Sequence, residues 1–484
     1  MTQQERASNP RPEATQGRKK SEVADIDRSM YDFRKDESHQ EHLDAGLTPD
    51  IVREISAKKN EPDWMLEHRL KSLEIYNSLP VPNWGPSIEG LDMDNIVTYV
   101  KPDTDQQASW EDVPDDIKDT FERLGIPKAE RTYLAGVGAQ YDSELVYHSM
   151  QDSAAKMGIV YSGIEEALEG EYADLIREKF MTLIPPTDHK FAALHGAVWS
   201  GGSFVYVPKG VKLDYPLQSY FRLNAKGAGQ FEHTLIIVED DADLHFIEGC
   251  SAPKYNVANL HAGAVELFVG KRAHLRYSTI ENWSKNMYNL NTKRARCDEE
   301  GEIEWISGSF GSHVGYLYPM SILAGRKAKA SFTGITFAGR GQNLDTGCKV
   351  VLGAPDTAAS VETKGISKDG GIQTFRSSVV ATPNAVGSRC TVSCQSLMLD
   401  DRSRSDTIPA MDIRCKNVDV GHEATIGRIG DDKIFYLMSR GIGEEEARTM
   451  IVNGFADPVS KELPLEYAVE MNNLINLEMK GSIG

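Results

Sequence analysis

A short turn motif recurs along the middle of the chain, and its spacing is the feature that most restricts the fold. Charged or glycine-containing turns between short apolar segments begin at Val207, Val238, Val269, Cys297, Ala324, Leu352 and Val380. They are separated by 31, 31, 28, 27, 28 and 28 residues. A near-constant period of this length is typical of a solenoid, in which each coil completes the core of its neighbour. We therefore predict a β-solenoid core over residues 195–425, with a β-sandwich of regularly spaced hairpins as the alternative.

The segments on both sides of the repeat follow a helical pattern. In the N-terminal part, residues 46–190, Thr48 followed by Pro49 is a helix start signal, and further helical segments follow. Helical periodicity returns in residues 430–484, where we expect Gly454 and Pro458 to interrupt it before a final helix. This C-terminal part is predicted to cap the solenoid or to offer a surface to a partner. The polar residues 1–45 are predicted to form a disordered tail.

Composition excludes several classes of protein. The formal net charge of -19 has the wrong sign for wrapping nucleic acid or binding an anionic membrane. The longest purely aliphatic run, LIIV at 235–238, is far shorter than a membrane helix, and the N-terminus has no apolar signal segment. Six cysteines without a Cys-x-x-Cys pair suit a reducing cytoplasm. The basic cluster KRAR at 293–296 is predicted to be a solvated loop.

Sequence motifs give little support for a common enzyme site. The chain has no Gly-x-x-x-x-Gly-Lys-Ser/Thr loop, no Gly-x-Ser-x-Gly elbow, and no second histidine after His422-Glu423 to complete a zinc protease motif. The acid pairs at 240–241 and 400–401 are predicted to be solvated corners. A carbohydrate-active β-helix enzyme with an acidic cleft nevertheless stays open as the alternative function.

The cysteines are the remaining candidates. Cys390 and Cys394 are expected on one face of a strand, with their sulfurs roughly 13 Å apart, so they are either buried small side chains or separate reactive groups. Cys250 has small neighbours, which leads us to expect an approachable thiol. Together with His422 and Glu423, these residues offer sulfur, imidazole and carboxylate ligands without a local chelate, a set that would hold a metal cluster weakly.

Four segments resemble the SufB/SufD family of the Suf iron-sulfur cluster assembly system. They are "YFRLNAKGAGQFEHTLIIVEDDADLHFIEGCSAPKY", "SCQSLMLDDRSRSDTIPAMDI", "GHEATIGRIG" and "MIVNGFADPV" followed by "LPLEYAVE". The resemblance covers nearly everything after residue 45. It implies a right-handed parallel β-helix core between helical ends, and a non-enzymatic scaffold that builds a transient cluster for transfer to apo-proteins.

The resemblance also implies partners and residue roles. The partners are an ABC-type ATPase (SufC) docked on the C-terminal helices, a SufD-type paralogue or a second copy of the chain, a cysteine desulfurase and a sulfur-relay protein. Cys250 resembles the thiol that accepts persulfide sulfur, and Arg222, Asn224, Trp283 and Lys293 resemble residues lining a sulfur path. Cys394, His422 and Glu423 resemble the residues that hold a nascent cluster, expected to have four irons and four sulfurs.

The resemblance leaves some residues and one cofactor without an assignment. Some relatives carry an acid where this chain has Gly421, so a third carboxylate is not expected at the cluster site. Cys297, Cys348, Cys390 and Cys415 match no motif with a role. The sequence does not decide whether a flavin takes part.

Overall fold

The computed structural model describes residues 40–480, except 103, 105, 108 and 124–133. Most of the predicted tail therefore lies outside the described residues. Its last part does not follow the prediction, because Gln40–His42 form strand β1, which pairs antiparallel with β2 (Val100–Pro102).

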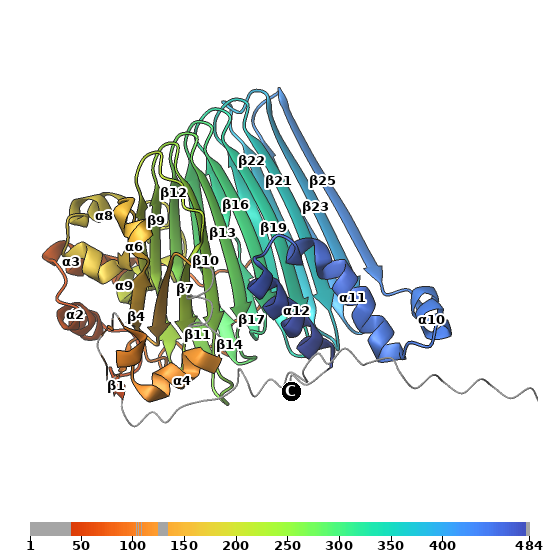
Figure 1. Ribbon diagram of the computed structural model, residues 1–484, viewed down its shortest axis with the longest axis horizontal. Coiled ribbons are helices and arrows are strands. Elements are labelled where there is room, and N and C mark those ends of the chain that lie inside the picture. Colours follow the sequence, from red (N-terminus) through yellow and green to blue (C-terminus); the bar gives the residue numbers. More distant parts are fainter. Residues whose placement is uncertain (1–39, 103, 105, 108, 124–133, 481–484) are drawn as a thin grey trace, which may run out of the picture.

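The core is a β-solenoid of about eight coils, as the turn period predicts. Figure 1 shows its strands stacked side by side along the molecule. The first wall is a ten-stranded sheet in the order β25-β23-β21-β19-β16-β13-β10-β7-β3-β4, parallel except for the β3–β4 pair. Its strands are β3 (Gly136–Tyr141), β4 (Glu144–Met150), β7 (Leu217–Arg222), β10 (Asp243–Ser251), β13 (His274–Asn282), β16 (Glu302–Phe310), β19 (Lys329–Ala338), β21 (Ala358–Ser367), β23 (Ser388–Met398) and β25 (Val418–Arg428).

The second wall is a thirteen-stranded sheet whose strands become longer along the solenoid. Most early coils contribute two short strands to it, separated by a bend, and from β20 onward each coil contributes a single long strand. Its strands are β5 (Val160–Gly163), β6 (Ser203–Val207), β8 (Gly229–Gln230), β9 (His233–Val238), β11 (Asn259–His261), β12 (Ala264–Val269), β14 (Met287–Asn289), β15 (Thr292–Cys297), β17 (Val314–Leu317), β18 (Met320–Leu323), β20 (Asn343–Leu352), β22 (Ile372–Ala381) and β24 (Arg404–Ile413).

The recurring turns form one corner of the solenoid. Each contains a residue with positive φ, a conformation that tight turns require. These residues are Gly210, Asp241, Arg272, Glu300, Lys327, Asp356 and Gly387. Charged side chains pair between neighbouring coils along this corner, as Arg272 does with Asp241 at 2.6 Å. The predicted solvated corner at 240–241 is therefore confirmed, and these acids do not form a cleft.

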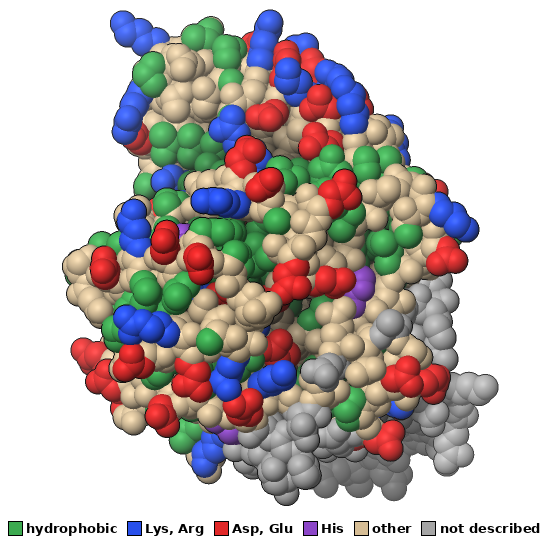
Figure 2. Space-filling model, turned by 90° about the vertical axis from the view of Figure 1, so that its left-hand side faces the viewer, with side chains coloured by type: hydrophobic (Ala, Val, Ile, Leu, Met, Phe, Trp, Pro, Cys, Tyr) green, Lys and Arg blue, Asp and Glu red, His purple; other side chains and the backbone are tan. Residues whose placement is uncertain are grey.

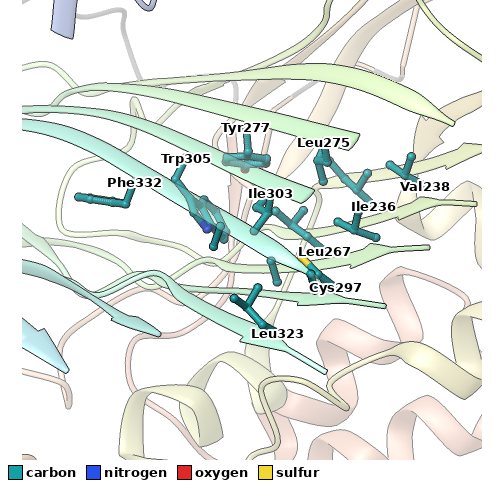
Figure 3. Packing of buried hydrophobic residues seen from close by; sticks show 14 of the residues in the cluster. Ile236, Val238, Leu267, Leu275, Tyr277, Cys297, Ile303, Trp305, Leu323 and Phe332 are labelled. Atoms are coloured by element: carbon teal, nitrogen blue, oxygen red, sulfur yellow. The ribbon is translucent and has the colours of Figure 1, made fainter. Parts of the chain in front are cut away.

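The interior is apolar along one half of each coil. Residues 244, 275, 303, 330 and 359 form one stacked row in register, and residues 246, 277, 305, 332 and 361 form a second. Figure 3 shows part of this cluster, in which Tyr277, Trp305 and Phe332 lie in successive coils. Cys297, Cys348 and Cys390 belong to the same cluster, and burial raises the pKa of Cys390 to about 12. These three thiols therefore pack in the apolar interior.

The N-terminal part covers one end of the solenoid (Figure 1). Its helices are α2 (Pro49–Lys58), α3 (Asp63–Ser78), α4 (Asp115–Arg123), α6 (Asp152–Lys156), α7 (Ile164–Leu168), α8 (Ala173–Lys179) and α9 (Lys190–Val198), with a 3-10 turn η1 (Trp110–Asp112). Thr48 caps α2 as predicted, because its side chain accepts a hydrogen bond from the Ile51 N–H. The part is not wholly helical, since β3, β4 and β5 extend the two sheets.

The C-terminal helices α10 (Asp431–Ser439), α11 (Glu444–Ser460) and α12 (Leu465–Met479) follow β25. Side chains of α11 and α12, such as Val452 and Ile475, pack on outward-facing isoleucines of the first wall, such as Ile335. The predicted interruption at Gly454 and Pro458 is wrong, because both lie inside α11. Pro458 stands in the last turn, where the missing N–H costs only one helical hydrogen bond.

The surface carries both signs of charge. Figure 2 shows acidic and basic side chains interspersed over the face at the N-terminal end. None of the helices in the described residues is long and apolar enough to cross a bilayer.

Candidate functional site

Cys250 is buried inside the solenoid rather than approachable from outside. It is the penultimate residue of β10, which pairs with β7 and β13, and only 1% of its surface is exposed. The small neighbours that suggested an open thiol allow Phe221, Trp283 and Val100 to pack around it instead. Burial and the negative charge of Glu248 raise the pKa of the Cys250 thiol well above its usual range. The thiol therefore needs a base in order to act as a nucleophile.

A charged network surrounds this thiol. Glu248 lies 3.8 Å from the Cys250 sulfur through Oε1, which also accepts a 2.5 Å hydrogen bond from the Lys293 ammonium. The second oxygen of Glu248 accepts a hydrogen bond from the Tyr277 hydroxyl. Lys293 also donates to the Thr279 hydroxyl at 3.0 Å. Burial acts to lower the pKa of Lys293, but the negative charges of Glu248 and Glu281 outweigh it and raise that pKa.

The network continues away from the thiol. Glu281 lies 3.9 Å from Lys293 and accepts a hydrogen bond from Asn289 at 2.8 Å. Asn289 in turn contacts His261, whose Nε2 is 2.5 Å from Glu232. Burial raises the pKa of Glu281, whereas the charge of Glu232 overcomes burial and raises the pKa of His261. This buried network thus contains three carboxylates and two cationic groups.

The sequence-predicted path residues lie in this region. Arg222 donates to the Ser251 hydroxyl at 3.1 Å, Asn224 follows two residues later, and Trp283 packs against His261 with ring centroids 4.7 Å apart. All three are buried. Lys293 belongs to β15, so the predicted solvated loop at 293–296 is wrong. Strand alternation turns Lys293 inward to Glu248 and leaves Arg294 and Arg296 facing outward.

Sequence reasoning missed Glu248, Glu281 and His261. Their signal in the sequence is weak, because a charged or polar residue in a strand is normally predicted to face outward. Register supplies the missing information: Glu248 shares the inward face with Leu244, Phe246 and Cys250.

Cys394 and His422 meet at the other end of the solenoid. Cys394 lies on β23, on the same face as Cys390 as predicted, and its sulfur is 3.7 Å from His422 Nε2 and 3.3 Å from the Thr407 hydroxyl. Burial raises the pKa of Cys394, although the Thr407 contact opposes this effect. His422 belongs to β25, the terminal strand of the first wall. The site therefore borders an open sheet edge.

Glu423 does not join this pair within one chain. It follows His422 on β25, so its side chain is on the opposite face of the strand, and it is exposed. Accordingly, no three His, Cys, Asp or Glu side chains within the described residues are arranged to hold a metal ion. Within the described residues, one chain brings together a thiol and an imidazole at this edge.

Two inward rows of residues connect the ends. The strand register aligns residues 250, 281, 309, 336, 365 and 396 in one row and residues 248, 279, 307, 334, 363 and 394 in the other. We call these rows the polar ladders, because they contain hydroxyls, carboxylates, thiols and glycines but no large apolar side chain. Five strand spacings separate Cys250 from Cys394, which is about 24 Å.

Comparison with known proteins gives the class to which this chain belongs. The model described as "SUF system FeS cluster assembly, SufBD core domain" matches residues 221–455, and "SufBD protein N-terminal region" matches residues 52–219. These are proteins of iron-sulfur cluster assembly.

Individual relatives match almost the whole chain. Iron-sulfur cluster assembly protein SufB of Bacillus subtilis (strain 168) is 49% identical over 462 residues, which is 96% of this chain and 99% of that protein. Iron-sulfur cluster assembly SufBD family proteins of Staphylococcus aureus (strain MRSA252) and Staphylococcus saprophyticus are each 49% identical over 460 residues, 95% of this chain and 99% of each relative. The chain belongs to the SufBD family.

Proposed function

We propose that the chain is a scaffold that accepts persulfide sulfur and iron, builds a transient iron-sulfur cluster, and passes it to apo-proteins. The observation that carries this proposal is the pair of polar ladders between a buried thiol and a thiol-imidazole pair at an open edge. The cluster is cargo, so a weak and incomplete ligand set serves its release.

Sulfur acceptance is a thiol exchange. The Cys250 thiol gives its proton to the neighbouring Glu248 carboxylate, and the resulting thiolate attacks the outer sulfur of a donor persulfide. The donor sulfur-sulfur bond breaks, the donor cysteine leaves as a thiolate, and Cys250 becomes the persulfide. The Lys293 ammonium stabilises negative charge beside the reacting sulfur. The donors are a cysteine desulfurase and its relay protein, and their docking is proposed to expose Cys250, because only 1% of its surface is exposed in the single chain.

Cluster assembly is proposed at the open edge. Cys394 and His422 supply two ligands, and a second chain beside β24 and β25 supplies the rest. That chain is a SufD-type paralogue or a second copy of this one. Glu423, on the outer face of β25, is then an iron ligand in the assembled complex rather than in the single chain. The C-terminal helices are the proposed dock for the ATPase partner, a SufC-type protein.

Substitution at the open edge tests the scaffold role. We expect Cys394→Ala and Glu423→Ala to retain the far-ultraviolet circular dichroism of the parent chain, while the purified complex fails to bind iron and sulfide. Cys390→Ala is the matched control, because this thiol is buried on the same strand face, whereas the His422 contact is made by the Cys394 sulfur. Unchanged iron and sulfide content in both test variants would remove Cys394 and Glu423 from the site.

Cys250 is tested separately by sulfur loading. We expect Cys250→Ser to accept no sulfur from a persulfide donor, since a serine hydroxyl cannot form the persulfide, while the fold is retained. Mass spectrometry of the labelled chain reads the added sulfur, with Cys297→Ser as the control for a buried core thiol. Normal loading of the Cys250→Ser chain would end this assignment.

A further inference from the structure

The second wall of the solenoid is interrupted where the early coils bend. Leu290 and Asn291 lie between β14 and β15, and Tyr318 and Pro319 lie between β17 and β18. Pairing between these two coils stops after Asn289 and Gly315 and resumes only at Arg294 and Met320. The wall is therefore made of side chains at this point, without continuous backbone hydrogen bonding.

An outer pocket lies against this interruption. Its volume is about 360 Å³, and Trp84, His189, Phe191, Arg294, Tyr316 and Lys349 contribute to its lining. Arg294 is already paired with Asp188. Asn291 and Tyr318 complete the lining at the solenoid wall.

An inner cavity lies behind the same two residues. Asn291 and Tyr318 also line this cavity, together with Thr279, Glu281 and Lys293 of the buried charged network. Its volume is about 20 Å³, which is enough for one water-sized molecule. A third cavity of the same volume shares Ser307, Leu317, Pro319 and Phe332 with it and extends to Gln373. Asn291 and Tyr318 thus separate the outer pocket from a row of small cavities along the polar ladders.

The Asn291 amide is the second observation. Its residue is only 5% exposed, and neither Nδ2 nor Oδ1 has a hydrogen-bond partner among the described residues. A buried amide without a partner is costly, and a small hydrogen-bonding molecule in the cavity would satisfy it.

We propose that this interruption is a lateral opening through which small hydrogen-bonding hydrides, water and hydrogen sulfide, enter the solenoid beside Lys293. Asn291 and Tyr318 form the partition, and the Asn291 amide binds the passing molecule. Size excludes a protein-borne thiol from the inner cavity. Charge favours a neutral ligand, because the carboxylates Glu232, Glu248 and Glu281 are matched in number by the cationic groups Arg222, Lys293 and His261. The proposal rests on the cavities and the Asn291 amide and not on the assembly role, so its failure would leave that role untouched.

The reactivity of Cys250 toward a small reagent tests the opening. Glu281 lines the inner cavity and is the strand neighbour of Cys250. Methyl methanethiosulfonate transfers its methylthio group to a thiol and leaves as methanesulfinate, which takes up the thiol proton. We expect Tyr318→Ala to accelerate labelling of Cys250 in the full chain by about fivefold or more, because a close-packed partition is removed. Asn291→Trp, which fills the partition, should slow it by a similar factor.

Two comparisons make the result specific. Trp84→Ala changes the exposed edge of the outer pocket only, so its Cys250 labelling rate should equal that of the parent chain. Mass spectrometry of each cysteine distinguishes an opening from general loosening. Equal Cys250 rates in all variants, or acceleration of the core thiol Cys390 by the same factor as Cys250, would overturn the proposal.

Discussion

At the scale of single residues, the unusual feature is a lysine buried among carboxylates. Lys293 is the cation that balances Glu248 and Glu281, and it is 8% exposed. A buried ion pair is weak evidence of net stability, but removal of one partner leaves a charge uncompensated. Lys293 therefore contributes to stability in addition to its proposed role with the persulfide, and the two roles can be separated.

A double variant separates the effect of Lys293 on stability from its effect on sulfur loading. Lys293→Met should lower the free energy of unfolding by about 3–5 kcal/mol, because Glu248 loses its buried partner. The double variant Lys293→Met with Glu248→Gln should recover most of that loss in chemical denaturation, yet stay defective in sulfur loading. If the double variant is no more stable than Lys293→Met alone, the two side chains are not coupled as their 2.5 Å contact indicates.

At the scale of elements, cross-strand contacts hold neighbouring coils together. On the outer side of the first wall, His274 of β13 lies 2.9 Å from Asp243 of β10 and 3.6 Å from Glu304 of β16. Hydrogen bonds to these two carboxylates raise the pKa of His274 to about 9. The hydrogen bond from His274 also contributes most to lowering the pKa of Glu304 to about 2.

This contact predicts a pH dependence of stability. The folded chain holds the His274 proton more tightly than the unfolded chain, so its contribution is complete below about pH 6.5 and is lost as the pH rises through about 9. Because the site is partly exposed, we expect a loss of about 1–2 kcal/mol over this interval. Thermal or chemical unfolding of the parent chain should show it, and His274→Gln should not. An identical slope in both chains would contradict the assignment.

At the scale of the whole molecule, the sequence predicts the architecture better than the site. The turn period is readable because every coil repeats one tight corner, and Asp241 and Arg272 occupy equivalent places in it. The exposure of Cys250 is not predictable from its neighbours, because small residues can leave a thiol accessible or allow larger side chains to pack over it. The positions of Glu248 and Glu423 follow only from the strand register, because the register decides which strand face lies in the interior.

The central claim is that the polar ladders carry sulfur from Cys250 to Cys394. Ser307 lines both inner cavities, and Ser307→Leu should block them, while Thr333→Leu on the outward face of β19 is the matched control. With a labelled persulfide donor, mass spectrometry should find label at Cys250 in all chains, and at least about tenfold less at Cys394 in Ser307→Leu, since packed interiors leave no detour. Equal label at Cys394 in Ser307→Leu and the parent chain would contradict the account.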